Sequence, residues 1–208
     1  IRAAALPPAA HAGLYDKAKH STFKLAKLYD DARLYWTVPF YVPAAHVSSV
    51  ADLAKPEVKT RMPSTIVSLP ESPGLTTVGR EVLKAYGLDA AGYQLKAAAP
   101  ADWIGTFKQA YEAGQWIVFP LWQPQWINAV YDLRILEEPK GIYGKDSAFL
   151  IAHQGLKSKL SERALKHLSN IRLSVPAITE MGRGRNIERN TPREARQVDG
   201  HRAAAGEH

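Results

Sequence analysis

The sequence predicts an α/β fold with a largely parallel sheet, and three observations lead to this prediction. Short runs of apolar and β-branched residues alternate with longer amphipathic segments between residues 65 and 121. Glycines follow the amphipathic segments at Gly87 and Gly114, where helices commonly end. The run Trp116–Leu121 is continuously apolar, as strands buried on both faces of a sheet are.

The first quarter of the chain predicts a helix, an extended segment and a short helix. Apolar residues at helical spacing predict a helix over Tyr15–Leu28. Two prolines exclude a helix from Trp36–Pro43, and its aromatic and β-branched residues favour extended backbone. Ser49 and Asp52 are both able to accept first-turn N–H groups, so a short helix is expected to begin there.

The rest of the chain continues the alternation of strands and helices. Strands are expected at Thr65–Leu69, Tyr93–Ala97, Trp116–Leu121 and Ser147–Ala152. A helix is expected at Leu75–Tyr86. A second helix is expected to begin at a cap formed by Asp102 and to carry Trp103, Phe107, Ala110 and Tyr111 on one face. Further helices are expected over Ser161–Leu173, Val175–Met181 and Pro192–Val198.

Composition excludes several classes of protein. With 208 residues, 46% hydrophobic and 23% charged, the chain is neither disordered, collagen-like nor a disulfide scaffold. The absence of cysteine excludes thiol catalysis, zinc–cysteine sites and iron–sulfur clusters. No stretch reaches the roughly 18–20 apolar residues of a membrane span.

The sequence divides into three regions. Residues 1–14 are Ala/Pro-rich and read as a leader remnant, residues 15–180 form the α/β region, and residues 181–208 form a basic helical tail. The net charge of +7 comes in part from arginines in this tail. Acidic residues are interleaved with them and the tail has no aromatic residue, which favours a solvated tail over a nucleic-acid-binding arm.

The segment Trp122–Trp126 is the first candidate binding site. It directly follows an apolar strand, and ligands of open α/β sheets collect at the carboxyl ends of strands. Two indole faces suit a quaternary ammonium, because its charge is diffuse and its methyl groups cannot donate hydrogen bonds. Gln123 and Gln125 are placed to meet a polar end of such a ligand. The alternative is that both tryptophans are core residues.

The turn Pro70–Thr77 is the second candidate. A helix start at Gly74 and Leu75 presents free backbone N–H groups, which suit a carboxylate. The alternative is a turn whose proline, serine and glycine serve geometry alone.

Catalytic and metal sites are not supported by the sequence. The seven histidines form no HxxxH or HxH pair, and no GxSxG motif is present. Glu137 and Glu138 are adjacent carboxylates of a kind that is usually solvated, and His153 is better explained as a surface or core residue. We therefore expect no catalytic residue, no metal and no cofactor.

Several blocks, taken in order, resemble the substrate-binding protein of glycine betaine/proline betaine ABC transporters. The resemblance rests on Tyr35–Val42, Val47–Val58, Ile66–Gly74, Glu81–Leu88 and Ile117–Gly141, which includes the motif W-x-P-x-W at Trp122–Trp126. It implies a type 2 periplasmic-binding-protein-like fold in which 208 residues supply one complete lobe plus part of the second. It also implies a periplasmic or extracellular position and delivery of a quaternary amine to an ABC permease of the inner membrane.

The resemblance also assigns roles to single residues. Trp122 matches a tryptophan of the family's aromatic cage, and Trp126 matches the second tryptophan of the motif. Leu75 stands where some members have a further cage tryptophan, and Gln125 stands where histidine is common. The tail departs from the family's final helix, which suggests a truncated or frame-disrupted member. The rival hypothesis is a lobe that binds no ligand and forms homo-oligomers through its exposed cleft face.

Overall fold

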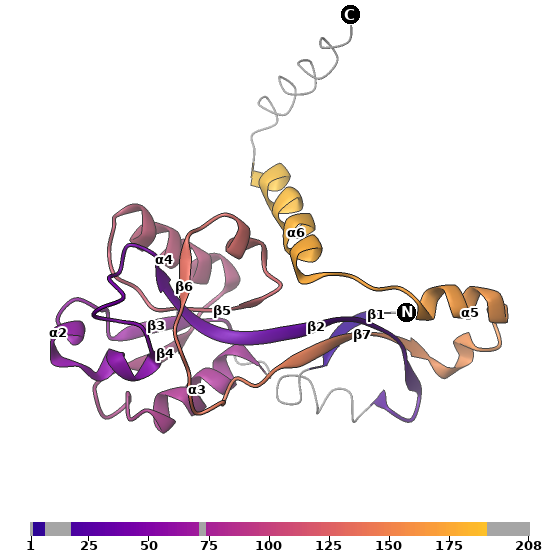
Figure 1. Cartoon of the computed structure of the whole chain (residues 1–208), viewed down its shortest axis with the longest axis horizontal. Coiled ribbons are helices and arrows are strands. Elements are labelled where there is room, and N and C mark those ends of the chain that lie inside the picture. Colours follow the sequence, from indigo (N-terminus) through magenta and orange to yellow (C-terminus); the bar gives the residue numbers. More distant parts are fainter. Residues whose placement is uncertain (1, 7–17, 71–73, 191–208) are drawn as a thin grey trace, which may run out of the picture.

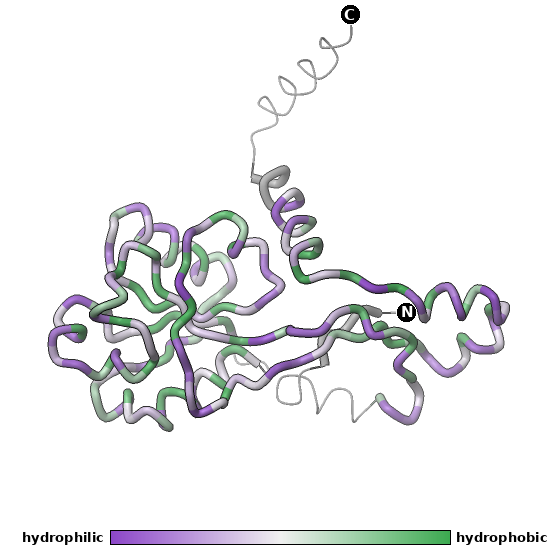
Figure 2. Tube along the Cα trace, in the orientation of Figure 1, coloured by the Kyte–Doolittle hydropathy of each residue, from purple (hydrophilic) through white to green (hydrophobic). Residues whose placement is uncertain are grey.

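The structure is a computed structural model that describes residues 2–6, 18–70 and 74–190. Figure 1 shows a compact α/β lobe, an antiparallel ribbon that leads away from it, and helix α6 (Val175–Asn190), which returns toward the lobe. Hydrophobic residues lie mainly on strands inside the lobe, whereas helix α5 (Glu162–Ser169), at the far end of the ribbon, is mostly hydrophilic (Figure 2).

Strand β2 (Thr22–Pro39) connects the ribbon with the lobe. Its residues 22–32 pair with β7 (Asp146–His153), residues 33–37 pair with β5 (Phe119–Gln123), and residues 37–39 pair with β6 (Leu133–Ile135). Strand β1 (Arg2–Leu6) extends the sheet on the other side of β7, so the order is β1-β7-β2-β5. The strand therefore changes partners between residues 32 and 33, where the ribbon meets the lobe.

The predicted helix over Tyr15–Leu28 is wrong from Thr22 onward, because this part of the chain belongs to β2. The pairing of β2 with β7 contains three register shifts between Lys24 and Ala32. Each irregularity disturbs the two-residue alternation of a strand. The buried residues Leu25, Leu28 and Ala32 consequently fall three and four positions apart, which is the spacing of a helix face.

The prediction of a largely parallel sheet is also wrong. Only β3 (Thr65–Ser68) and β4 (Gln94–Ala97) pair in parallel among the described strands. The other named ladders are antiparallel, because β2 lies outside the strand–helix units and runs against each of its partners. The strand–helix alternation identified β3 and β4 but carried no information about the direction of β2.

The helices follow the sequence expectations more closely. They are η1 (Val50–Ala54), α2 (Pro56–Lys59), α3 (Leu75–Ala85), α4 (Pro100–Glu112), η2 (Trp126–Ala129), η3 (Gln154–Leu156), α5 and α6. The Asp52 carboxylate accepts the backbone N–H groups of Ser48 and Ser49 at 2.9 and 2.8 Å, which confirms a helix start at this point. The predicted cap at Asp102 is wrong: α4 begins earlier, at Pro100, since proline is well suited to a first helical position.

Some of the boundary predictions shift or lie outside the described residues. The strand expected over Trp116–Leu121 begins three residues later, as β5. The segment read as a leader remnant contributes β1, because its backbone pairs with β7. Helix α6 covers the predicted helix Val175–Met181 and continues to Asn190, whereas the predicted helix Pro192–Val198 lies outside the described residues. Within the part of the chain that is described, no helix has the length and apolar character to cross a bilayer.

Two hydrophobic clusters form the core of the lobe, on opposite faces of β2. Adjacent residues of β2 belong to different clusters: Trp36 lies in the first and Tyr35 in the second. Adjacent residues point to opposite faces of a sheet, so the sheet separates the two clusters. The second cluster contains the aromatic residues that surround the candidate site.

Candidate functional site

Three strand ends of the lobe meet at the second hydrophobic cluster. Strand β3 leads into α3, strand β4 leads into α4, and β5 ends inside the segment 122–126. Leu69 after β3, Trp103 near the start of α4 and Trp122 in β5 all pack in this cluster. The candidate site is thus built from three separate stretches of sequence.

Four aromatic rings form a continuous stack that ends at Trp122. The ring centroids of Phe107 and Phe119 are 4.2 Å apart, and those of Phe119 and Trp103 are 4.7 Å apart. The Trp103 and Trp122 rings follow at 5.5 Å, with an angle of 19° between their planes. Trp103 is 5% exposed and Phe107 and Phe119 are almost fully buried, whereas Trp122 is half-buried. The indole of Trp122 is therefore the outer, solvent-accessible member of the stack.

Trp126 has different neighbours from Trp122. It is the first residue of η2, it is half-buried, and helix α6 packs on η2. A Cβ atom added at Gly182 of α6 would lie 3.3 Å from Trp126 Cβ, so the helix approaches this tryptophan closely. Gln125 caps η2, because its side-chain Oε1 accepts the backbone N–H of Trp126 at 2.7 Å. The amide oxygen of Gln125 is thus already used within the protein.

Gly74 and Leu75 lie at the start of α3. Gly74 is the N-cap residue, with φ 139°, a conformation that favours glycine. Leu75 is buried, so its side chain belongs to the core. The Thr76 hydroxyl lies 2.9 Å from Ser68 Oγ and also hydrogen-bonds the Leu69 carbonyl, which ties the helix start to the end of β3. Residues 71–73 of the predicted turn lie outside the described residues.

Sequence reasoning missed Trp103, Tyr35 and Asn128 as residues of this region. Trp103 was placed correctly on the buried face of a helix, but its contact with Trp122 depends on which strand ends are neighbours. The Tyr35 hydroxyl donates to Asn128 Oδ1 at 3.1 Å. Burial raises the pKa of Tyr35 to about 12, although the hydrogen bond with Asn128 opposes this shift. A cavity of about 220 Å³ lies beside this pair, lined in part by Gln123, Tyr131 and Thr179.

The residues weighed as catalytic have structural partners. The Glu138 carboxylate accepts the Tyr86 hydroxyl at 2.7 Å and the backbone N–H groups of Lys140 and Ile142 at 3.0 and 2.6 Å, so it holds a turn. His153 Nδ1 accepts the backbone N–H of Gly155 at 3.0 Å and caps η3. No group of three or more potential metal ligands occurs among residues 2–6, 18–70 and 74–190.

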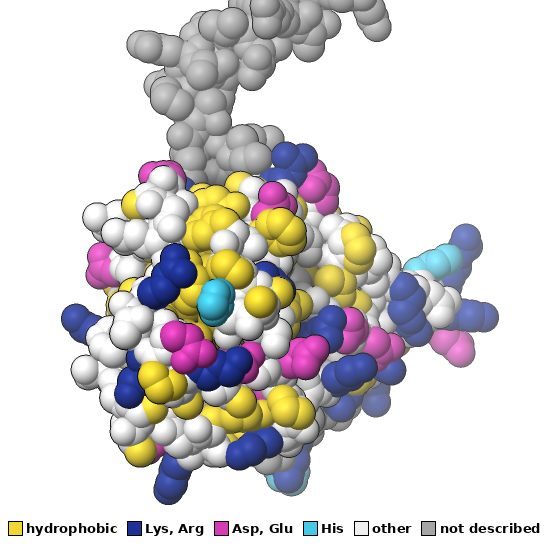
Figure 3. All heavy atoms as spheres, turned by 60° about the vertical axis from the view of Figure 1, so that its left-hand side comes forward, with side chains coloured by type: hydrophobic (Ala, Val, Ile, Leu, Met, Phe, Trp, Pro, Cys, Tyr) yellow, Lys and Arg dark blue, Asp and Glu magenta, His cyan; other side chains and the backbone are white. Residues whose placement is uncertain are grey.

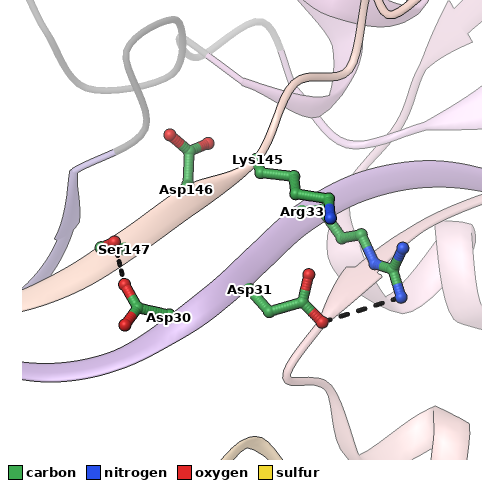
Figure 4. A pocket seen from close by; sticks show the side chains of 6 residues that line it. All are labelled: Asp30, Asp31, Arg33, Lys145, Asp146 and Ser147. Carbon is green, nitrogen blue, oxygen red and sulfur yellow. Dashed lines mark hydrogen bonds and ion pairs between the residues drawn. The ribbon is translucent and has the colours of Figure 1, made fainter.

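A second cavity, of about 460 Å³, lies where β2 passes from the ribbon into the lobe. Figure 4 shows its six lining side chains, which come from β2, from the start of β7 and from the residue before it: Asp30, Asp31, Arg33, Lys145, Asp146 and Ser147. Asp146 points away from the pair formed by Asp30 and Ser147, whose oxygens are 2.5 Å apart. Burial raises the pKa of Asp146 to about 6.

Comparison with known proteins identifies the kind of protein to which this fold and site belong. Residues 4–197 match the family described as the substrate binding domain of ABC-type glycine betaine transport system. A glycine betaine/carnitine transport binding protein of Listeria monocytogenes is 29% identical over 105 residues, which are 50% of this chain and 35% of that protein.

Two solved structures share the fold. Lactococcal OpuAC in its closed conformation with glycine betaine has a TM-score of 0.71 and 24% identity, and the match covers 97% of this chain and 76% of that one. The glycine betaine, L-proline-binding protein ProX of Borrelia burgdorferi has a TM-score of 0.65 and 24% identity, and the match covers 80% of this chain and 62% of that one. These matches confirm a type 2 periplasmic-binding-protein-like fold, with one complete lobe plus part of the second.

The chain spans 35% of the length of the curated relative and 62% of the Borrelia protein. The family model nevertheless covers nearly the whole chain, including the candidate site and both parts of the sheet. The family consists of binding domains of transport systems and not of enzymes. The chain belongs to the family of substrate-binding domains of ABC-type glycine betaine transport systems.

Proposed function

We propose that the chain captures glycine betaine or a related quaternary amine outside the cytoplasmic membrane and delivers it to an ABC permease. The observation that carries this proposal is the half-buried indole of Trp122, which is stacked on Trp103 at the meeting point of three strand ends. An indole face attracts a quaternary ammonium through its quadrupole, by about 0.5–2 kcal/mol depending on desolvation. The family and the solved relatives that bind such amines support the same ligand class.

The remaining site residues are proposed to act around this indole. The start of α3 at Gly74 and Leu75 offers backbone N–H groups to the ligand carboxylate, since a helix start favours negative charge. Trp126 and Gln125 form the far wall of the site, where η2 begins. No nucleic acid and no cofactor is part of this function.

Titration calorimetry with glycine betaine, proline betaine, choline and carnitine tests the proposal. We expect heat of binding with at least one of the four, and a loss of up to about thirtyfold in affinity for Trp122→Ala. Trp122→Phe is compared with the matched control Trp116→Phe, because Trp116 belongs to the other hydrophobic cluster. A folded protein that binds none of the four amines would overturn the proposal.

A second candidate function is a homo-oligomeric lobe that binds no amine. Phe40 is 71% exposed, and Tyr41, Val130 and Ile135 are exposed as well. Figure 3 shows hydrophobic side chains gathered on one face of the lobe among charged ones. A ligand-blind dimer in size-exclusion chromatography with light scattering would favour this candidate, whereas an amine-binding monomer would exclude it.

A further inference from the structure

Asn128, a residue of η2, holds the segment that carries Trp122. Its Nδ2 donates to the backbone carbonyl of Trp122 at 3.0 Å and to that of Gln125 at 3.1 Å. Its Oδ1 accepts the Tyr35 hydroxyl at 3.1 Å. One amide side chain thus connects both ends of the segment 122–125 with strand β2.

The segment needs such a partner because its second half leaves the β-ladder. The last residue of β5 that pairs with β2 is Gln123, opposite Arg33. Beyond it the backbone carbonyls lose their strand partners, and Pro124 has no N–H to offer. The Asn128 amide bonds the Trp122 carbonyl, which lies in the ladder opposite Leu34, and the Gln125 carbonyl beyond it, as asparagine side chains commonly do in turns.

Gln123 provides a second connection from the same segment to β2. Its Nε2 donates to the backbone carbonyl of Asp31 at 2.7 Å and to Asp31 Oδ2 at 2.9 Å. Asp31 has φ 67°, and it lies where β2 changes partners from β7 to β5. Asp31 also forms an ion pair with Arg33 at 3.8 Å (Figure 4). Trp122 and Gln123 are therefore both connected to β2 by side-chain hydrogen bonds, Trp122 through Asn128 and Gln123 directly.

We propose that Asn128 is a positioning residue for amine binding: its two donated hydrogen bonds fix the backbone at Trp122 and thereby the indole on which the ammonium rests. This proposal rests on the proposed function. Asn128 itself is exposed, so its removal leaves no cavity in the core. Its effect on binding passes through the orientation of Trp122 and through no contact with the ligand.

The experiment combines two substitutions with two readouts. Asn128→Ala removes all three hydrogen bonds, whereas Asn128→Asp keeps an acceptor for Tyr35 and places a carboxylate oxygen against two carbonyls. Asn170→Ala is the matched control, because Asn170 is the C-cap residue of α5, far along the chain from the site. The first readout is glycine betaine affinity by calorimetry. The second is the exciton couplet of the stacked Trp103 and Trp122 indoles in circular dichroism, with Trp122→Phe as the baseline.

We expect both Asn128 variants to lose about tenfold in betaine affinity and to show a weakened couplet, since both lose the two donated hydrogen bonds that fix the backbone at Trp122. Their urea midpoints should fall only modestly below that of Asn170→Ala, because the lost hydrogen bonds belong to an exposed side chain, so that the variants stay folded in the binding assay. Wild-type affinity and a wild-type couplet in Asn128→Asp would overturn the proposal, and so would losses that only follow the unfolded fraction. The couplet is measured without ligand, so it decides the positioning role even if the wild-type protein binds no amine.

Discussion

Replacing Asp146 by asparagine is predicted to make the protein more stable at neutral pH. Asp146 is 8% exposed, and its Oδ1 has no hydrogen-bond partner among the described residues. Burial raises its pKa from 3.8 to about 6. A raised pKa means that the folded state prefers the protonated carboxyl. The stabilising contribution is therefore complete below the unfolded pKa and is lost as pH rises through the folded pKa.

The size of the effect follows from this shift. A shift from 3.8 to about 6 corresponds to about 3 kcal/mol of lost stability once the carboxyl is ionised. When the titration of the carboxyl in both the folded and the unfolded state is counted, the contribution of Asp146 to the free energy of unfolding falls by about 1.4 kcal/mol between about pH 5 and about pH 7.5. The asparagine side chain of the variant has no charge to desolvate, so the variant avoids this part of the loss.

Urea unfolding at several pH values measures the difference. The stability gain of Asp146→Asn over wild type should grow by about 1.4 kcal/mol from about pH 5 to about pH 7.5. Asp30→Asn is the matched control on the opposite strand, because the hydrogen bond from Ser147 lowers the pKa of Asp30. Asp30 is ionised across this range in both states, so its variant should show no such growth. Parallel pH curves for wild type and Asp146→Asn would refute the reasoning.

Three further predictions concern the lobe, each measured by urea unfolding. Phe107→Ala should cost about 3–5 kcal/mol, because Phe107 is fully buried in the aromatic stack; a loss below about 1 kcal/mol would contradict this packing. Burial raises the pKa of Asp52, but hydrogen bonds from Lys55, Ser48 and Ser49 outweigh it and hold that pKa well below its usual range. At pH values above the ordinary pKa of an aspartate, Asp52→Ala should therefore lower the free energy of unfolding by about 1–2 kcal/mol. This difference from wild type should shrink as pH falls through the folded pKa. Gly105→Ala should raise the free energy of unfolding by about 0.5–1 kcal/mol, because Gly105 lies in α4 and an added Cβ would meet open space. Gly87→Ala should lower it by about 1 kcal/mol, because the φ of Gly87 is 63°. Equal effects of the two substitutions would contradict this conformational argument.

The elements with local determinants were predictable from the sequence. The starts of η1 and α5 depend on Ser49 with Asp52 and on Ser161, whose hydroxyl accepts the Ala164 N–H at 3.2 Å. Strands β3 and β4 have local apolar patterns, and their predicted positions are confirmed within one residue. Such features are decided by residues a few positions apart, which is the range that a single sequence reveals.

Strand β2 was not predictable because non-local pairing decides its structure. Its ribbon half pairs with β7, more than a hundred residues later in the chain. The irregularities in that pairing give its apolar residues the spacing of a helix. A local reading of periodicity therefore favours the wrong element, and knowledge of the partner strand is needed to correct it.

The candidate site shows the same division. The presence of Trp122 at the end of an apolar strand was visible in the sequence, because both features are local, although the strand extends through Trp122 to Gln123. Its stacking on Trp103 depends on α4 starting beside the end of β5, and its support by Asn128 depends on a hydrogen bond from Tyr35, 93 positions earlier. The sequence therefore located the indole, but it gave no indication of what holds it.

If the chain binds an amine as proposed, the strength of binding would measure how many groups contact the ligand beside Trp122. One desolvated indole contributes at most about 2 kcal/mol to the binding of a quaternary ammonium. Micromolar affinity requires about 8 kcal/mol, so in the proposed function Trp122 would determine where the ammonium rests without accounting for tight binding. The stack beneath Trp122 reduces the entropic cost of binding, because a ring that is already fixed against Trp103 loses little rotamer freedom when the ligand binds. Millimolar affinity would thus correspond to Trp122 and its stack alone, whereas micromolar affinity would require further side chains that contact the ligand.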